Sequence, residues 1–189
     1  MYLLVGLGNP GSKYKKNRHN VGHLTIDIIA TKYGFVKKSK NKFGDIFEGK
    51  ISNIKIFALK PKDFMNLSGV SIKKFLDFYK INMKNLLVIH DDIDLPLGKI
   101  KIKIGGGNAG HNGLKNIDTI VGKNYKRIRI GINRPKNNTS VDKFVLGNFE
   151  KKEKKEIMFS INRVVSFLQY FISSDANDIS ILMNKLSKK

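Results

Sequence analysis

The chain has 189 residues, 41% of them hydrophobic, which is enough for one buried core, and no linker or repeat divides it. Because it contains no cysteine, disulfides, thiolate zinc sites and cysteine nucleophiles are excluded. A formal charge of +21 favours a polyanionic partner, with nucleic acid as the leading class. Genome base composition explains this charge equally well, because most of the basic residues are lysines in a chain rich in Asn and Ile.

Hydrophobic patterns predict strands that alternate with helices, followed by a helical C-terminal third. The expected strands are 2–7, 46–51, 54–59, 86–90, 100–104 and 128–132, and the expected helices are 21–33, 66–80, 113–121 and one from about residue 151. Ser52 and Asn53 predict a hairpin turn, and Ser174 or Asp175 is expected to cap a last helix. We therefore expect one α/β domain over residues 1–189, with a mixed, mostly parallel sheet and helices on both faces.

No stretch reaches the roughly 18 apolar residues that a membrane span needs. The opening residues, MYLLVG, have no basic region ahead of their apolar run, so we expect no signal peptide. The sequence thus predicts a cytoplasmic protein without a membrane partner.

The glycines of VGLGNPG match the G-x-G-x-x-G fingerprint of dinucleotide-binding proteins. However, Pro10 interrupts the motif, and the next helix begins only near Asn20, too late for its N-terminus to receive a pyrophosphate. The acidic residue at the required spacing is Asp27, which falls inside that helix. We favour a tight loop after a strand over a nucleotide site.

His19 lies in a polar stretch, RHN, just before the first helix. It is either an ordinary residue at a helix start or a general base. His23 follows four residues later and would lie on the same helix face, so the two histidines could bind a metal together. No third ligand has useful spacing, so we expect His23 to pack in the interior.

Three aspartates, Asp91, Asp92 and Asp94, follow the buried strand 86–90. They would bind a divalent cation, or lie in solvent, or supply through Asp91 a carboxylate that orients His19. Asn66 and Asn112 stand at helix starts, either as caps or as amide donors to a carbonyl oxygen that gains charge. Composition and spacing alone indicate a basic α/β protein with a possible hydrolytic site.

Six segments together closely resemble bacterial-type peptidyl-tRNA hydrolase. In order, they are GLGNPG, Tyr14, RHNVG, FMNLSG, HDDIDLPLG and GGGNAGHNGL, and the resemblance runs from Val5 to Phe149. Asp92 stands where a glutamate is common, the glycine-rich loop reads NAG in a variable stretch, and the helices after Glu150 match only loosely.

The resemblance implies that water activated by His19 cleaves the ester between peptide and tRNA, with Asp91 supporting the histidine. It implies that Asn9 distinguishes N-blocked from free aminoacyl-tRNA. The other implied substrate contacts are Tyr14, Phe64, Met65, Asn66 and Asn112 at the peptide and acceptor end, and Lys101, Lys103 and Arg129 at the tRNA phosphates.

The same resemblance implies a monomer that recycles tRNA in translation without a metal or cofactor. A non-catalytic RNA-binding protein on the same fold is the alternative, and it would bind tRNA without turnover and tolerate changes at His19 and Asp91.

Overall fold

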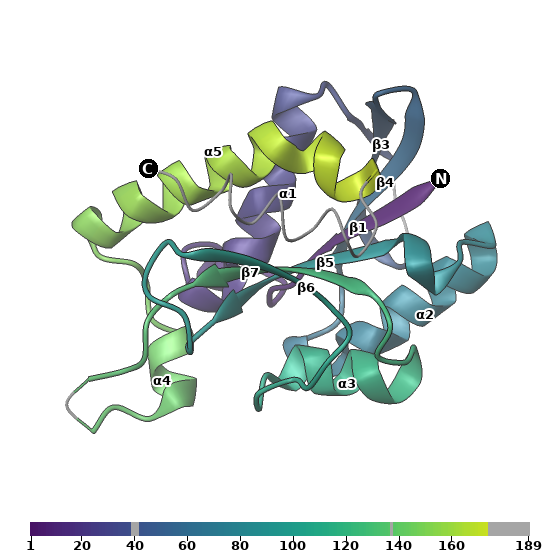
Figure 1. Cartoon of the computed structure of the whole chain (residues 1–189). Coiled ribbons are helices and arrows are strands. Elements are labelled where there is room, and N and C mark those ends of the chain that lie inside the picture. The colour runs from purple at the N-terminus through teal and green to yellow at the C-terminus, as the bar shows by residue number, and fades with distance from the viewer. Residues whose placement is uncertain (39–41, 137, 174–189) are drawn as a thin grey trace.

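A seven-stranded mixed sheet forms the centre of the computed structural model, which describes residues 1–38, 42–136 and 138–173 (Figure 1). The strand order is β2-β3-β4-β1-β5-β7-β6. The strands are β1 (Tyr2–Gly6), β2 (Val36–Lys38), β3 (Gly44–Ile51), β4 (Ile54–Pro61), β5 (Leu86–Asp92), β6 (Ile100–Ile104) and β7 (Lys126–Gly131). All six predicted strands are confirmed, and β2 was not predicted.

The expected mixed sheet is confirmed, but parallel pairs make up half of it rather than most. Within the described ranges β1 pairs in parallel with β4 and β5, and β5 pairs in parallel with β7. The other three pairs, β2 with β3, β3 with β4 and β6 with β7, are antiparallel. The two sheet edges are therefore antiparallel. The predicted hairpin turn has positive φ angles at Ser52 (47°) and Asn53 (63°).

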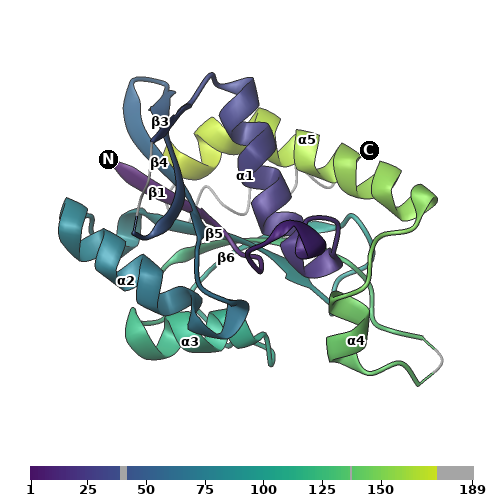
Figure 2. The same ribbon diagram turned by 180° about the vertical axis from the view of Figure 1, so that it is seen from behind.

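Helices cover both faces of the sheet. On one face α1 (Val21–Lys32) and α5 (Lys151–Ser173) lie side by side, and on the other lie α2 (Ser68–Tyr79) and α3 (Asn112–Ile120) (Figures 1 and 2). The short helix α4 (Val141–Val145) precedes α5. Each face has its own apolar cluster, and the stripe of α5 is buried as predicted at Ile157, Ile161, Val164, Val165, Leu168 and Phe171.

Single turns of 3₁₀ helix precede several of these elements. They are η1 (Ser12–Tyr14), η2 (Arg18–Asn20), η3 (Met65–Leu67) and η4 (Met83–Asn85). Among the helices of the described ranges, none is both long and apolar enough to cross a membrane. The expected cap at Ser174 or Asp175 lies outside the described residues.

The first glycines of the chain allow α1 to lie against the backbone of the sheet. A Cβ at Gly22 would stand 2.4 Å from the carbonyl oxygen of Ile89, and one at Gly6 would stand 2.2 Å from the carbonyl oxygen of Gly22. A Cβ at Gly8 would meet the ring of His23 at 2.6 Å. Gly6 and Gly8 are therefore required by helix packing.

We predict that Gly22→Ala lowers the free energy of unfolding by about 1–3 kcal/mol, because its methyl group would overlap the backbone atoms of Leu7 and Ile89. Denaturant unfolding followed by circular dichroism measures this change. Gly107→Ala is the control, since no heavy atom lies within 4 Å of its added Cβ, and its effect should stay within about 0.5 kcal/mol. Equal losses in both variants would contradict the packing explanation.

Candidate active site

The predicted catalytic residues meet at the carboxyl ends of the parallel strands. Asn9 follows β1, Asp91 lies near the end of β5, and His19 lies in η2 just before α1. Ligand sites in open α/β sheets commonly lie at this edge. The topology therefore brings together residues that are far apart in the sequence.

His19, which is partly buried, pairs with the buried Asp91. The Nδ1 atom of His19 lies 2.9 Å from both carboxylate oxygens of Asp91, whose side chain is 2% exposed. Burial alone would lower the pKa of His19, but the charge and hydrogen bond of Asp91 outweigh it, so the pKa is raised. Burial opposes ionisation of Asp91, yet the two histidines beside it hold its pKa well below the ordinary value. Nδ1–H of His19 thus donates to Asp91, which leaves Nε2 to accept a proton.

Buried contacts hold the turn that carries His19. Arg18 pairs with Glu153 of α5 at 2.7 Å, and its guanidinium lies 4.4 Å from the centre of the Phe144 ring. Asn17 bonds through its amide nitrogen to the carbonyl oxygen of Leu146. The C-terminal third, whose role the sequence left open, therefore fixes the position of the candidate base.

His111 is a residue of the site that the sequence reasoning missed. Its Nε2 lies 3.1 Å from Oδ1 of Asp91, and its Nδ1 accepts hydrogen bonds from the backbone N–H groups of Gly113 and Leu114. Because Nδ1 acts as an acceptor at the start of α3, the hydrogen is on Nε2 and donates to Asp91. Two imidazoles therefore hold one carboxylate. The sequence signal that could have predicted this role is the position of His111 directly before Asn112-Gly113, where a helix begins.

Asn9 is anchored at the junction of three segments. Its backbone N–H donates to Oδ1 of Asn20 at 2.9 Å, and its carbonyl oxygen accepts from the Asn20 amide at 2.8 Å. Its own Oδ1 accepts from the backbone N–H of Met65 at 2.9 Å. The oxygen of the Asn9 amide is thus occupied, and its nitrogen has no hydrogen-bond partner among the residues that the structure describes. Asn20 is a second positioning residue that the sequence reasoning missed.

The remaining predicted peptide-end residues surround this centre. Met65 is buried, and its sulfur would lie 2.6 Å from a Cβ at Gly113, so η3 packs against the start of α3. Phe64 is 53% exposed and makes an edge contact with the ring of Tyr14, with ring centroids 6.1 Å apart. These contacts place the loop after β1 beside η3.

Asn66 and Asn112 are both exposed, and neither side chain has a hydrogen bond within the described part of the chain. The cap residue of α3 is His111, not Asn112, and that of α2 is Leu67. The simple capping interpretation is therefore wrong for both asparagines, and their amides are available to a ligand.

The basic residues Lys101 and Lys103 lie on the edge strand β6, and Arg129 lies on β7, the strand next to β5. Lys101 is opposite Arg129 in the strand register, and Lys101 and Lys103 are exposed. Arg129 is less free than expected, because its Nε pairs with Asp92 at 2.6 Å. Asp94 pairs with Arg134, so the other two aspartates after β5, Asp92 and Asp94, each have a cationic partner.

One group of possible metal ligands occurs in the described ranges, namely His19, Asp91 and His111, with donor atoms within 4.8 Å of one another. His23, which the sequence analysis rejected as a metal partner of His19, is not part of it. Burial lowers the pKa of His23 to about 3, in agreement with its predicted interior packing. Hydrogen bonds from His19 and His111 to Asp91 explain why these three side chains lie close together. The expectation that the site holds no metal remains a prediction.

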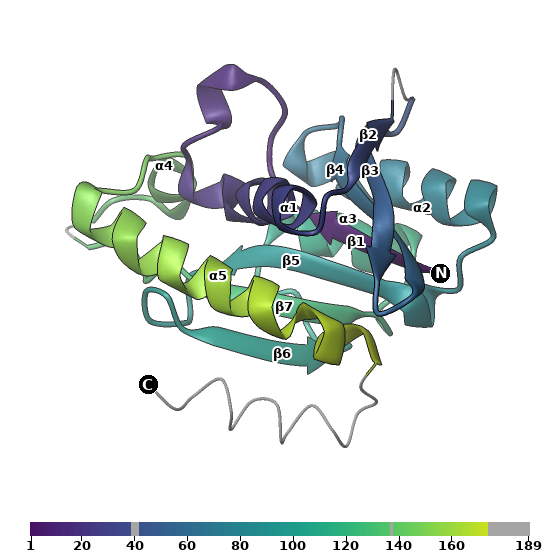
Figure 3. The ribbon, with the colours of Figure 1, turned by 90° about the horizontal axis from the view of Figure 1, so that it is seen from above.

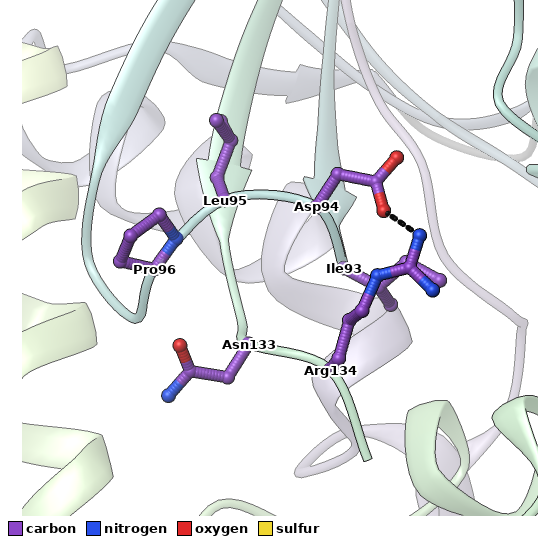
Figure 4. Close-up of a pocket in the computed structure, with 6 residues that line it drawn as sticks. All are labelled: Ile93, Asp94, Leu95, Pro96, Asn133 and Arg134. Atoms are coloured by element: carbon purple, nitrogen blue, oxygen red, sulfur yellow. Dashed lines mark hydrogen bonds and ion pairs between the residues drawn. The ribbon is translucent and has the colours of Figure 1, made fainter.

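An open hollow of about 500 Å³ lies where the chain leaves β5 and β7 (Figure 4). Its lining residues are Ile93, Asp94, Leu95, Pro96, Asn133 and Arg134. The Asp94–Arg134 pair on its rim is exposed, and such a pair adds little stability. Since none of the predicted catalytic residues lines it, this hollow is distinct from the candidate site.

Comparison with known proteins gives a consistent result along the chain. A family model described as Peptidyl-tRNA hydrolase matches residues 3–189. The chain is 50% identical over 167 residues to Peptidyl-tRNA hydrolase of Rickettsia prowazekii, covering 88% of this chain and 90% of that protein. It is 43% identical over 188 residues to that of Bartonella henselae, covering 100% and 96%.

Solved structures agree with the sequence relatives. A crystal structure of peptidyl-tRNA hydrolase from Acinetobacter baumannii has a TM-score of 0.90 at 36% identity, covering 98% of this chain and 94% of that one. A uridine phosphorylase from Vibrio fischeri has a TM-score of 0.54 at 9% identity, which shows a likeness of fold alone.

Proposed function

The chain belongs to the peptidyl-tRNA hydrolase family, and from that premise we propose that it hydrolyses the ester bond between a peptide and tRNA. The observation that carries the proposal is the pairing of His19 with the buried Asp91, which leaves one imidazole nitrogen to act as a base. The alternative of a non-catalytic RNA-binding protein offers no reason for such a pairing.

In the proposed reaction Nε2 of His19 removes a proton from water as the water oxygen attacks the carbonyl carbon of the ester. Asp91 stabilises the imidazolium that forms. The carbon–oxygen bond to the ribose then breaks, and the imidazolium returns its proton to the leaving ribose oxygen. The free amides of Asn66 and Asn112 are suited to donate to the carbonyl oxygen as it gains negative charge.

The substrate contacts follow the distribution of charge and polarity. We propose that Lys101 and Lys103 bind phosphates of the acceptor stem, with Arg129 contributing through the guanidinium nitrogens that Asp92 leaves free. Tyr14, Phe64 and Met65 would border the peptide end.

The decisive test uses N-acetyl-aminoacyl-tRNA and purified protein. Release of the N-acetyl amino acid and free tRNA supports the esterase, whereas salt-dependent tRNA binding without turnover would support the RNA-binding alternative. We also propose that the protein acts in the cytoplasm, where translation supplies its substrate, and as a monomer, which light scattering coupled to gel filtration tests.

Asn9→Asp is predicted to erode the preference for N-blocked substrates. Aspartate can still accept the hydrogen bond from the Met65 backbone, but it loses the N–H donor that we propose contacts the substrate. We expect kcat/KM for N-acetyl-aminoacyl-tRNA to fall roughly 5- to 100-fold, the effect of leaving one buried polar group unpaired. The measurement is the ratio of hydrolysis rates for N-acetylated and free aminoacyl-tRNA.

Asn82→Asp is a matched control for this variant. Asn82 also accepts a backbone hydrogen bond through Oδ1, from Lys84. It precedes η4 and therefore lies at the amino end of β5, whereas the candidate site lies at the carboxyl end. It should leave both rates unchanged, and an unaltered ratio in Asn9→Asp would remove the selective role of Asn9.

A further inference from the structure

A buried ion pair lies beneath the glycine-rich loop, residues 105–110, and is separate from the contacts assigned to the candidate site. It joins Arg127 of β7 to Asp118 of α3, whose side chains are 2% and 4% exposed, with Nη2 of Arg127 3.2 Å from Oδ1 of Asp118. Arg127 stands opposite Val88 in the strand register, on the face of the sheet that α2 and α3 cover. A buried cation needs several acceptors, because its loss of hydration can exceed the attraction within a single ion pair.

The other acceptors of Arg127 are carbonyl oxygens of the glycine-rich loop. Nη1 of Arg127 donates to the carbonyl oxygen of Gly107 at 2.9 Å, and Nη2 donates to that of Gly106 at 2.8 Å. One planar guanidinium therefore holds two consecutive peptide groups, which the single ammonium nitrogen of a lysine cannot do in the same geometry.

The loop itself is short of packing. Four of its six residues, Gly105, Gly106, Ala109 and Gly110, have positive φ angles between 49° and 87°. From residue 106 to residue 110 only Asn108 is partly buried, and the others are exposed. Small exposed residues bury little apolar surface, so the conformation of this segment depends on its hydrogen bonds to buried groups.

A run of hydrogen bonds joins the ion pair to the candidate active site. Oδ2 of Asp118 accepts from the side-chain amide of Asn108 at 3.3 Å, and the carbonyl oxygen of Asn108 accepts from the backbone N–H of His111 at 2.9 Å. His111 in turn donates to Asp91 at 3.1 Å. The anchored loop thus ends at the imidazole that holds the candidate catalytic carboxylate.

We propose that Arg127 is a positioning residue, which fixes the glycine-rich loop so that Nε2 of His111 stays directed at Asp91. Arg127 is buried behind the loop and acts on the reaction through His111. The inference rests on the proposed esterase only for its effect on rate, because the state of the His111 ring can be measured without substrate.

Nitrogen NMR of the histidine side chains tests the position of His111. The chain has four histidines, so isotopically labelled imidazoles can be assigned. About two pH units above the ordinary histidine pKa of roughly 6.5, the shifts distinguish ring nitrogens that carry a hydrogen from those that do not. Wild-type His111 should show one tautomer, with the hydrogen on Nε2.

Arg127→Lys keeps a cation beside Asp118 but loses the paired contacts to the loop. Both ring nitrogens of His111 should then move toward the shifts of a mixture of tautomers. His23, which is buried in α1, is the internal reference and should keep its signals. Unchanged signals of His111, or equal changes at His23, would overturn the inference.

The same variant should slow the reaction with little effect on substrate binding. Single-turnover hydrolysis of N-acetyl-aminoacyl-tRNA at saturating enzyme should be roughly 10- to 100-fold slower, the effect of displacing a group of the site by about 1 Å. The enzyme concentration that gives half the maximal rate should change less than about threefold, because phosphate contacts supply most of the binding free energy.

Asn108→Ala is a second variant, at a loop residue whose change leaves the buried ion pair in place. It removes the side-chain hydrogen bonds of Asn108 with Asp118 and with the backbone N–H of Gly110. The single-turnover rate should fall roughly 2- to 10-fold, the effect of one lost hydrogen bond. A rate equal to that of the wild type in both Asn108→Ala and Arg127→Lys would contradict the proposed role.

Val164→Ala is the control for a general loss of stability. Val164 is fully buried on α5, which lies on the opposite side of the sheet from α3 (Figure 3). The variant should unfold at lower denaturant concentration but keep its single-turnover rate within about twofold of the wild type. A loss of rate as large as that of Arg127→Lys would show that the rate follows stability alone.

A double variant with His111→Ala separates positioning from an unrelated loss. If Arg127 acts through His111, Arg127→Lys should slow the His111→Ala protein less than about twofold, and not by the full factor that it has in the wild type. Losses that multiply would overturn the inference. A wild-type protein that hydrolyses no ester would instead refute the proposed function, and the NMR signals would still decide whether Arg127 fixes His111.

Discussion

Replacing His19 with asparagine is expected to lower kcat for N-acetyl-aminoacyl-tRNA by roughly 10²–10⁴-fold, the contribution of one positioned general base. The amide of asparagine can still donate to Asp91, so the buried carboxylate keeps a partner, but no group remains that can remove a proton from water. Single-turnover hydrolysis with saturating enzyme measures the chemical step directly.

The loss should appear in kcat rather than in substrate binding. The affinity for uncleaved N-acetyl-aminoacyl-tRNA, measured by anisotropy, should change less than threefold or so, because phosphate contacts supply most of the binding free energy. A variant that retains near wild-type kcat would exclude His19 as the base. Unfolding monitored in parallel shows whether the variant keeps its fold.

The sequence predicted the elements well because their patterns are local. The alternation of Ile100, Ile102 and Ile104 with lysines, for example, marks a half-buried strand without any long-range information, and the structure confirms it. The short strand β2 (Val36–Lys38) was missed because its three residues are exposed and show no alternation. Its strand conformation depends on pairing with β3, which no local pattern reveals.

The site was less accessible to this reasoning because it is built from pairings across the chain. Taken alone, His19 and Asp91 gave ambiguous signals, and only the resemblance joined residues 72 positions apart. His111 was missed because asparagine is a common helix cap, so the sequence pattern predicted Asn112, and not the histidine before it, as the cap of this helix. Its role follows from two backbone donors and one carboxylate, a geometry that only coordinates provide.

Asp91→Asn is expected to lower kcat by roughly 10²–10⁴-fold, because it would hold His19 in the tautomer that cannot act as a base. His111 is a fixed donor, because its Nδ1 already accepts from the backbone at the start of α3. The single oxygen of the new asparagine is therefore drawn to His111, and its amide N–H₂ faces Nδ1 of His19. That arrangement forces the histidine hydrogen onto Nε2, where it blocks acceptance of a proton from water.

The dependence of kcat/KM on pH distinguishes this mechanism from a merely structural loss. In the wild type the carboxylate raises the pKa of His19 above its usual 6.5, so activity should rise with pH through that raised pKa and disappear below it. In Asp91→Asn only burial and the weak field of Asp142 remain, and burial lowers the pKa of His19, so the acid limb should move to lower pH. An acid limb that stays in place would show that Asp91 does not control the ionisation of the base.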